Sequence, residues 1–280
     1  MPLTTTGELV TRAHAARTAV AAFNVITLEH VEAVVAGAEA VGASVVLQVS
    51  ENAVKFRQGR LLPLARAAAV AAERAAVPVA LHLDHVQSAA LLGQAADAGF
   101  GSVMYDASRL PYAENLAATR IAVDRAHAQG LWIEAELGEI GGKGAHTPGA
   151  RTDPAEARAF VAESGVDALA VAIGSVHAMT ARTAALDHDL LARLSTALDV
   201  PLVLHGSSGV PDGELTAAVA GGIAKVNIGT ALNQAMTAAI RDHLETHPDA
   251  VDARTYLSAG REAMARTVER IITGVGLTLL

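Results

Sequence analysis

The sequence predicts an α/β fold: a closed (β/α)8 TIM barrel with a C-terminal helical extension. Eight short apolar or β-branched runs alternate with alanine-rich stretches that carry helix signals. Such alternation predicts parallel strands joined by right-handed crossovers. The length of 280 residues suits one barrel of this kind, and no linker or shift in composition divides the chain. We therefore expect a single domain over residues 1–280.

The eight strands are predicted from the apolar runs at residues 20–25, 44–49, 78–84, 101–105, 131–137, 168–173, 201–204 and 223–228. Between them, Pro63 and Pro154 each suit a first helical turn, and Asp153 provides a cap for the second. An open, doubly wound sheet is the alternative, but it normally has a glycine-rich phosphate loop after its first strand. This chain has none there. From about residue 233 onward, leucine, isoleucine and alanine predict helices that pack on the barrel or on a partner subunit.

Composition excludes several classes of protein. A hydrophobic content of 51% makes disorder unlikely, and a net charge of −8 with only three lysines argues against a nucleic-acid partner. Without cysteine there are no disulfides, thiolate ligands or cysteine nucleophiles. The alanine-rich stretches are broken by charges before they reach membrane-spanning length, and no N-terminal signal is visible. We expect a cytoplasmic protein without a membrane partner.

Histidines follow three predicted strands, and this placement favours a metal site. His85 and His205 stand where apolar strands end, and His177 follows its strand after one small turn. Because a barrel gathers the carboxyl ends of its strands on one face, these imidazoles meet despite their separation in sequence. With Asp84 beside the first of them, they form an open divalent-metal site with room for substrate. Further polar residues end the other strands: Asn24, Gln48, Ser50, Asp106, Glu134, Glu136, Asn227 and Thr230.

Each of these residues also has a structural interpretation. A single histidine at a strand end is more often a hydrogen-bonded structural residue than a ligand, and His82 is predicted to be buried and structural. Asp106 is either a metal ligand or a helix cap. Lys225 either pairs with a carboxylate or takes part in the reaction as a nucleophile. One of the two glutamates after residue 133 is a candidate ligand and the other a supporting group. The remaining histidines are predicted to be solvated: His14, His30, His127, His188, His243 and His247.

Six segments together resemble a known family. They are residues 81–85 (LHLDH), 102–106 (SVMYD), 134–138 (EAELG), 172–177 (AIGSVH), 203–209 (VLHGSSG) and 225–227 (KVN). In this order they resemble the class II, metal-dependent ketose-bisphosphate aldolases, which include the fructose- and tagatose-bisphosphate aldolases. The resemblance spans residues 4 to about 240.

The resemblance implies a role for each matching residue. His85, His177 and His205 would hold a catalytic Zn²⁺, with Glu136 as an alternative ligand. Asp84 would exchange the proton of the hydroxyl at the cleaved bond. The residues that would bind substrate, chiefly the phosphate of dihydroxyacetone phosphate, are Asn24, Gln48, Ser50, Arg182, Gly206, Ser208, Asn227 and Thr230.

The implied activity is reversible cleavage of a ketose phosphate to dihydroxyacetone phosphate and an aldehyde. A Lewis acid stabilises the enediolate that forms when the carbon–carbon bond breaks, and backbone amides of residues 206–209 can cradle an anion. Another divalent metal in place of Zn²⁺, and an additional monovalent cation, remain open. The resemblance also implies a homodimer or homotetramer.

Two departures from the family pattern affect the substrate and the base. The family's loop acid is replaced after residues 141–142 by Lys143, which leaves His146 as the candidate base for carbon deprotonation. The family's basic residue for a distal phosphate is Asn233 here, and Gly229 replaces an aspartate. A substrate with one phosphate, or a sugar acid, is therefore expected alongside a bisphosphate. The alternatives are a non-catalytic sugar-phosphate sensor and a Schiff-base aldolase that uses Lys225.

Overall fold

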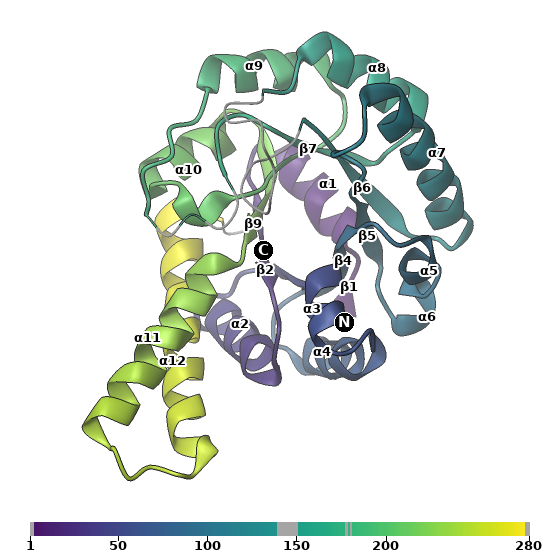
Figure 1. Cartoon of the computed structure of the whole chain (residues 1–280). Coiled ribbons are helices and arrows are strands. Elements are labelled where there is room, and N and C mark those ends of the chain that lie inside the picture. The colour runs from purple at the N-terminus through teal and green to yellow at the C-terminus, as the bar shows by residue number, and fades with distance from the viewer. Residues whose placement is uncertain (1–2, 139–150, 177–178, 180, 278–280) are drawn as a thin grey trace.

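The structure is a computed structural model that describes residues 3–138, 151–176, 179 and 181–277. Within this part of the chain, eight parallel strands pair in the closed ring β2-β3-β4-β5-β6-β7-β8-β9 (Figure 1). The bounds in this ring are β2 Val20–Asn24, β3 Val45–Ser50, β4 Val79–Val86, β5 Ser102–Tyr105, β6 Trp132–Leu137, β7 Ala168–Val171, β8 Leu202–Leu204 and β9 Ile223–Ile228. The predicted (β/α)8 barrel is confirmed.

Most strand ends lie within one residue of the sequence prediction, and three larger differences remain. A short strand β1 (Leu3–Thr4) pairs with the start of β4, and its two residues were too few for a pattern to reveal. Strand β7 ends two residues earlier than predicted. Strand β4 continues two residues further than predicted and includes His85.

Helices surround the barrel and follow the predicted signals. Their bounds are α1 Thr6–Ala16, α2 Leu28–Val41, α3 Glu51–Phe56, α4 Leu62–Arg74, α5 Ala89–Leu92, α6 Ala95–Ala98, α7 Tyr112–Ala128, α8 Pro154–Ser164, α9 His188–Ala197, α10 Asp212–Ala220, α11 Thr230–Thr246 and α12 Ala253–Val275. Pro63 lies in the first turn of α4, as predicted. Asp153 caps α8 by accepting hydrogen bonds from the backbone N–H groups of Ala155 and Glu156.

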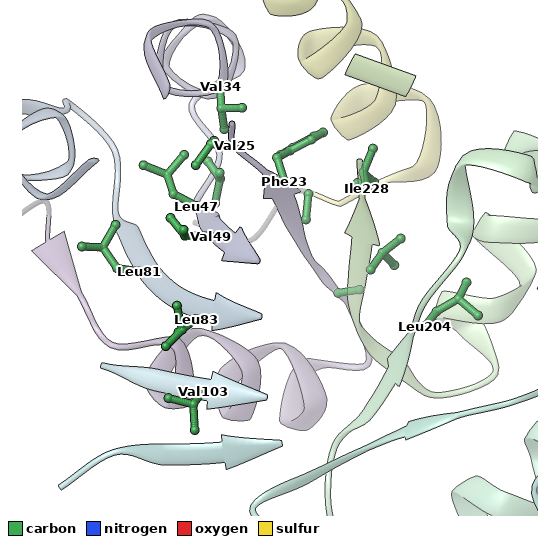
Figure 2. Close-up of a cluster of buried hydrophobic side chains, with 14 of the residues drawn as sticks. Phe23, Val25, Val34, Leu47, Val49, Leu81, Leu83, Val103, Leu204 and Ile228 are labelled. Atoms are coloured by element: carbon green, nitrogen blue, oxygen red, sulfur yellow. The ribbon is translucent and has the colours of Figure 1, made fainter. Parts of the chain in front are cut away.

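The apolar core lies between the barrel and its helices. Outward-facing strand residues such as Phe23, Leu47 and Leu83 pack there, and Figure 2 shows this cluster around β2, β3 and β4. Side chains alternate along a strand, so the next residues point into the barrel. Inward-facing apolar residues, among them Val20, Val46 and Ala80, form a second buried cluster with Leu9 and Val10 of α1.

The C-terminal helices pair with each other, and α12 packs along α2 (Figure 1). Gly37 of α2 allows this approach, because a Cβ there would lie 2.7 Å from Val268 Cβ. Arg261 adds an ion pair to Glu32 across the same contact. The expected packing of the C-terminal segment on the barrel is confirmed for α12. Within the described residues, no helix is long and apolar enough to span a membrane.

Candidate metal and phosphate site

A cavity of about 240 Å³ opens at the carboxyl ends of the strands. Its lining comes from segments that are far apart in the sequence and that the barrel brings together, as predicted. The lining residues are Asn24, Ile26, Ser50, Asn52, Asp84, His85, Gly206, Ser207, Ser208, Asn227, Gly229, Thr230 and Asn233. The polar residues that were predicted at the strand ends, where the structure describes them, therefore lie around this one cavity. Some of them line it, and others lie behind the lining.

Three predicted ligands lie together beside this cavity. One ligand atom from each of His85, Glu136 and His205 falls within 4.8 Å of the others. The two imidazole rings have centroids 4.9 Å apart. Imidazole nitrogens with one carboxylate oxygen form a donor set that suits Zn²⁺. These residues fit a divalent metal.

A backbone irregularity brings Asp84 and His85 to the same site. Strict alternation would send these consecutive residues to opposite faces of β4. The pairing of β4 with β5 shifts register between Leu83 and Val86, and His85 has a left-handed φ of +49°. This β-bulge redirects the side chain of His85, and non-glycine residues in this conformation are concentrated at functional sites. The sequence pattern predicted both residues for the site but contained no sign of the bulge.

Asp106 orients His85. Its Oδ2 lies 2.8 Å from His85 Nδ1, and its Oδ1 accepts hydrogen bonds from the backbone N–H and hydroxyl of Ser108. This arrangement leaves Nε2 of His85 as the ligand atom, and a carboxylate behind a metal-binding histidine is a common support. Burial opposes ionisation of Asp106, but the hydrogen bond and charge of His85 and the hydrogen bonds from Ser108 together lower its pKa. In this structure Asp106 supports a ligand and does not join the group of three.

His205 is held by two glutamates in the barrel interior. Its Nε2 lies 2.9 Å from Glu134, and its Nδ1 lies 3.1 Å from Glu136. Burial disfavours a charge on this ring, but the contacts and the negative charges of the two glutamates together raise the pKa of His205 to about 10. The two carboxylates therefore favour a positive charge at this position, and a bound divalent cation would supply such a charge.

Lys225 pairs with Glu134 through a 2.8 Å contact, and both side chains are fully buried. The predicted pairing of this lysine with a carboxylate is confirmed. The same contact argues against Lys225 as a Schiff-base nucleophile, because the amine has no exposed surface for a carbonyl substrate to approach. Lys225 instead balances the charge of the glutamate that holds His205.

We expect the substitution Lys225→Met to destabilise the metal-free protein by about 3–5 kcal/mol, because it leaves the buried Glu134 carboxylate without its cation. Chemical denaturation measures this loss. The matched control is Lys55→Met, which removes a surface pair with Glu51 and should cost at most about 1 kcal/mol. Equal effects of the two substitutions would show that the Lys225 pair does not stabilise the barrel.

Asp84 is fixed by a chain of amide side chains. Gln48 Nε2 lies 3.4 Å from Asn24 Oδ1, and Asn24 Nδ2 donates to Asp84 Oδ2 at 2.8 Å. The second carboxylate oxygen, Oδ1, has no hydrogen-bond partner among the described residues. Burial opposes ionisation of Asp84, but the nearby imidazoles of His85 and His205 hold its pKa well below its ordinary value. An ionised carboxylate with one unpaired oxygen therefore stands at the cavity wall.

The opposite end of the cavity has the features of an anion cradle. Gly206 has a φ of +67°, and a Cβ there would lie 2.7 Å from the backbone of Val176. Glycine is therefore required where this loop packs against the residue before His177. Ser208 and Thr230 line the cavity at the N-terminus of α11, whose backbone N–H groups favour an anion. The Oδ1 atom of Asn227 is buried and has no hydrogen-bond partner among the described residues.

Other predicted residues stand apart from this cradle or outside the described chain. The guanidinium of Arg182 binds Val210 O and Asp212, and it lines a second, smaller cavity behind Ser207 and Ser208. Its role in phosphate binding stays a prediction. His177 and His146 lie outside the described residues.

One residue that the sequence interpretation assigned to the surface is buried. His30 is 2% exposed, and its Nε2 lies 3.1 Å from Oδ1 of Asn233 at the cavity rim. The expectation of a solvated His30 was wrong, because the ring is buried and hydrogen-bonded to Thr27 before α2 and to Asn233 of α11. A helical pattern with one histidine in its first turn contains no signal for a partner that lies 203 positions away.

Comparisons with known proteins agree with the geometry. A family model described as fructose-bisphosphate aldolase class-II matches residues 4–278. A probable fructose-bisphosphate aldolase of Bacillus subtilis is 37% identical over 272 residues, which cover 96% of this chain and 95% of that protein. A fructose-bisphosphate aldolase of Staphylococcus aureus is 35% identical over 280 residues, covering 99% and 98%. The crystal structure of the YdjI aldolase from Escherichia coli K12 superposes with a TM-score of 0.86 at 31% identity and covers 99% of this chain and 98% of that one.

Proposed function

The chain belongs to the class-II fructose-bisphosphate aldolase family, and we propose that it cleaves a ketose 1-phosphate to dihydroxyacetone phosphate and an aldehyde. It is a metal-dependent aldolase, and the proposal adds the identity of the metal, Zn²⁺, and of the product. One observation carries the proposal. Asp84, one of whose carboxylate oxygens has no hydrogen-bond partner among the described residues, lines a cavity that has metal-type ligands beside it and an anion cradle at its far end.

In the proposed reaction, Gly206, Ser208 and Thr230 bind the substrate phosphate and set the position of the carbon chain. His85, His205 and Glu136 hold the metal, with the predicted ligand His177 completing the set. When bound, Zn²⁺ supplies a Lewis acid that stabilises the negative charge developing on the ketone fragment.

Asp84 moves the proton. In cleavage its free Oδ1 accepts the proton of the hydroxyl at the scissile bond, the oxygen forms the aldehyde carbonyl, and the bonding pair passes to the ketone fragment. In condensation Asp84 returns that proton. Asn24 holds the other oxygen throughout, so the carboxylate does not turn away from the substrate. His146 remains the predicted base for the carbon-bound proton.

We further propose that the substrate needs only one phosphate. A second phosphate at the far end gains a charge-assisted hydrogen bond only from a cation. None of the described residues that line the cavity is a lysine or an arginine.

The test compares cleavage of fructose 1-phosphate with cleavage of fructose 1,6-bisphosphate, and the release of dihydroxyacetone phosphate is the readout. We expect kcat/KM for the monophosphate to be at least equal to that for the bisphosphate. A strong preference for the bisphosphate would contradict the single-phosphate proposal alone. Failure to release dihydroxyacetone phosphate from any ketose phosphate, or to exchange its carbon-bound proton, would overturn the proposed function.

A homodimer or homotetramer is also proposed. Figure 1 shows that the paired helices α11 and α12 extend away from the barrel, and Val251 between them is 93% exposed. Light scattering of the purified protein tests this expectation, and a monomer at micromolar concentration would contradict it.

A further inference from the structure

A buried carboxylate joins the segment after β3 to the segment after β4. Glu51 is the first residue of α3, and it is 8% exposed. Its Oε2 accepts hydrogen bonds from the backbone N–H groups of Gln87 and Ser88, at 2.7 and 3.1 Å. Its Oε1 forms an ion pair with the exposed Lys55 at 2.8 Å. One carboxylate oxygen therefore binds a surface lysine, and the other binds the backbone of the next loop.

These contacts hold β4 on both sides of His85. Ser50, the last residue of β3, pairs in register with Asp84. Glu51 binds the two residues that follow β4, and only Val86 lies between them and His85. The end of β3 thus fixes the neighbouring backbone before and after the histidine. We call these contacts of Ser50 and Glu51 the β3 clamp.

The backbone at His85 requires support of this kind. Its φ of +49° is left-handed, and a non-glycine residue keeps such a conformation only where the surrounding structure fixes it. The ladder between β4 and β5 is irregular at this point, because its register shifts between Leu83 and Val86. Asp106 binds the His85 ring and sets its rotation, but that bond does not set the position of the Cα atom. The β3 clamp supplies this position.

We propose that Glu51 is a positioning residue of the metal site, which holds the backbone after His85 so that the imidazole keeps its place beside Glu136 and His205. Glu51 is not itself a member of the group of ligand atoms found among the described residues. Its contribution is an acceptor oxygen at a fixed place, and its charge is secondary. This inference rests on the metal site of the proposed function, and it does not depend on the substrate or on turnover.

The test measures Zn²⁺ affinity by competition with a chelator, and the visible absorption of the Co²⁺-substituted protein. Both are recorded at a temperature where circular dichroism shows that each variant is folded. We expect Glu51→Leu to lower the affinity about tenfold, the lower end of the usual effect of losing a group that supports a ligand. The Co²⁺ bands should also change, because they depend on the geometry of the ligands.

Two conservative variants test the geometric basis of this role. Glu51→Gln should keep most of the affinity, because its amide oxygen can accept from both backbone N–H groups without a charge. Glu51→Asp keeps the charge but is one methylene shorter, so it should lower the affinity, though less than Glu51→Leu. The aspartate variant also provides the measurement if the leucine variant does not fold.

Two controls separate positioning from general stability. Lys55→Met removes the partner of Oε1 and leaves the contacts of Oε2 in place. Glu39→Leu removes a carboxylate that accepts from the backbone N–H of Ala76 at 2.7 Å, in the segment before β4 and thus at the opposite end of that strand. Both controls should keep the Zn²⁺ affinity and the Co²⁺ spectrum of the wild-type protein.

The outcomes distinguish this inference from the proposed function. Unchanged affinity and spectrum in the folded leucine or aspartate variant would overturn the role of Glu51. An equal loss of affinity in Glu51→Gln, or in Glu39→Leu, would overturn it as well, because the acceptor at this place would then not be the cause. Failure of the wild-type protein to bind Zn²⁺ or Co²⁺ would instead overturn the metal site of the proposed function, and with it this inference.

Discussion

Chelation of the divalent metal should abolish turnover, with a loss of roughly 10³-fold or more that Zn²⁺ or Co²⁺ restores. A Lewis acid contributes several kcal/mol to the stabilisation of developing charge, and no described side chain in the cavity offers a comparable positive charge. The variants His85→Ala and His205→Ala should show the same loss without chelator, because each removes one ligand of the group formed with Glu136. Metal content by mass spectrometry and cleavage rate are the two measurements.

The two histidine variants should differ in stability. His85 is partly exposed, whereas His205 is fully buried between Glu134 and Glu136. Removing the second ring leaves two carboxylates in the barrel interior with fewer partners, so His205→Ala should unfold at a lower temperature. Circular dichroism shows whether each variant is folded before its metal content is compared. Full activity in metal-free wild-type protein would refute the metal site.

The barrel and the polar residues at the carboxyl ends of its strands could be predicted, because both follow from periodic patterns in the sequence. Alternation of strands and helices indicates a barrel, and a barrel brings strand ends together whatever their separation in sequence. This reasoning correctly brought Asp84, His85 and His205 to one site. It also explains the pairing of Lys225 with a glutamate, because inward-facing charges in a closed barrel must find partners within it.

The parts that could not be predicted depend on single contacts. The bulge at His85 leaves no mark in the hydrophobic pattern, since an irregular residue in a strand resembles any other. The burial of His30 depends on the start of α11, which meets α2 only in the folded chain. The position of Arg182 follows from its bond to Val210. Tertiary contacts of this kind decide the orientation of a side chain, whereas the pattern decides only the element that carries it.

Substitution of Asp84 should separate proton transfer from metal binding. We expect Asp84→Ala and Asp84→Asn to retain the metal and to lower kcat by about 10²–10⁴-fold, the usual contribution of a positioned acid or base. The reason is geometric, because one oxygen of Asp84 is held by Asn24 and the other is unpaired at the cavity wall. Asp84 is also absent from the group of ligand atoms formed by His85, Glu136 and His205.

Asp106→Asn provides the contrast, since Asp106 binds the back of the His85 ring. Loss of such a support lowers metal affinity by about 10–100-fold, and excess Zn²⁺ should rescue the activity. Excess metal should not rescue Asp84→Asn, because the missing group there carries a proton and holds no ligand in place. If metal content instead fell together with activity in the Asp84 variants, and added metal restored both, Asp84 would be a ligand or a support, and the proton would move through another group.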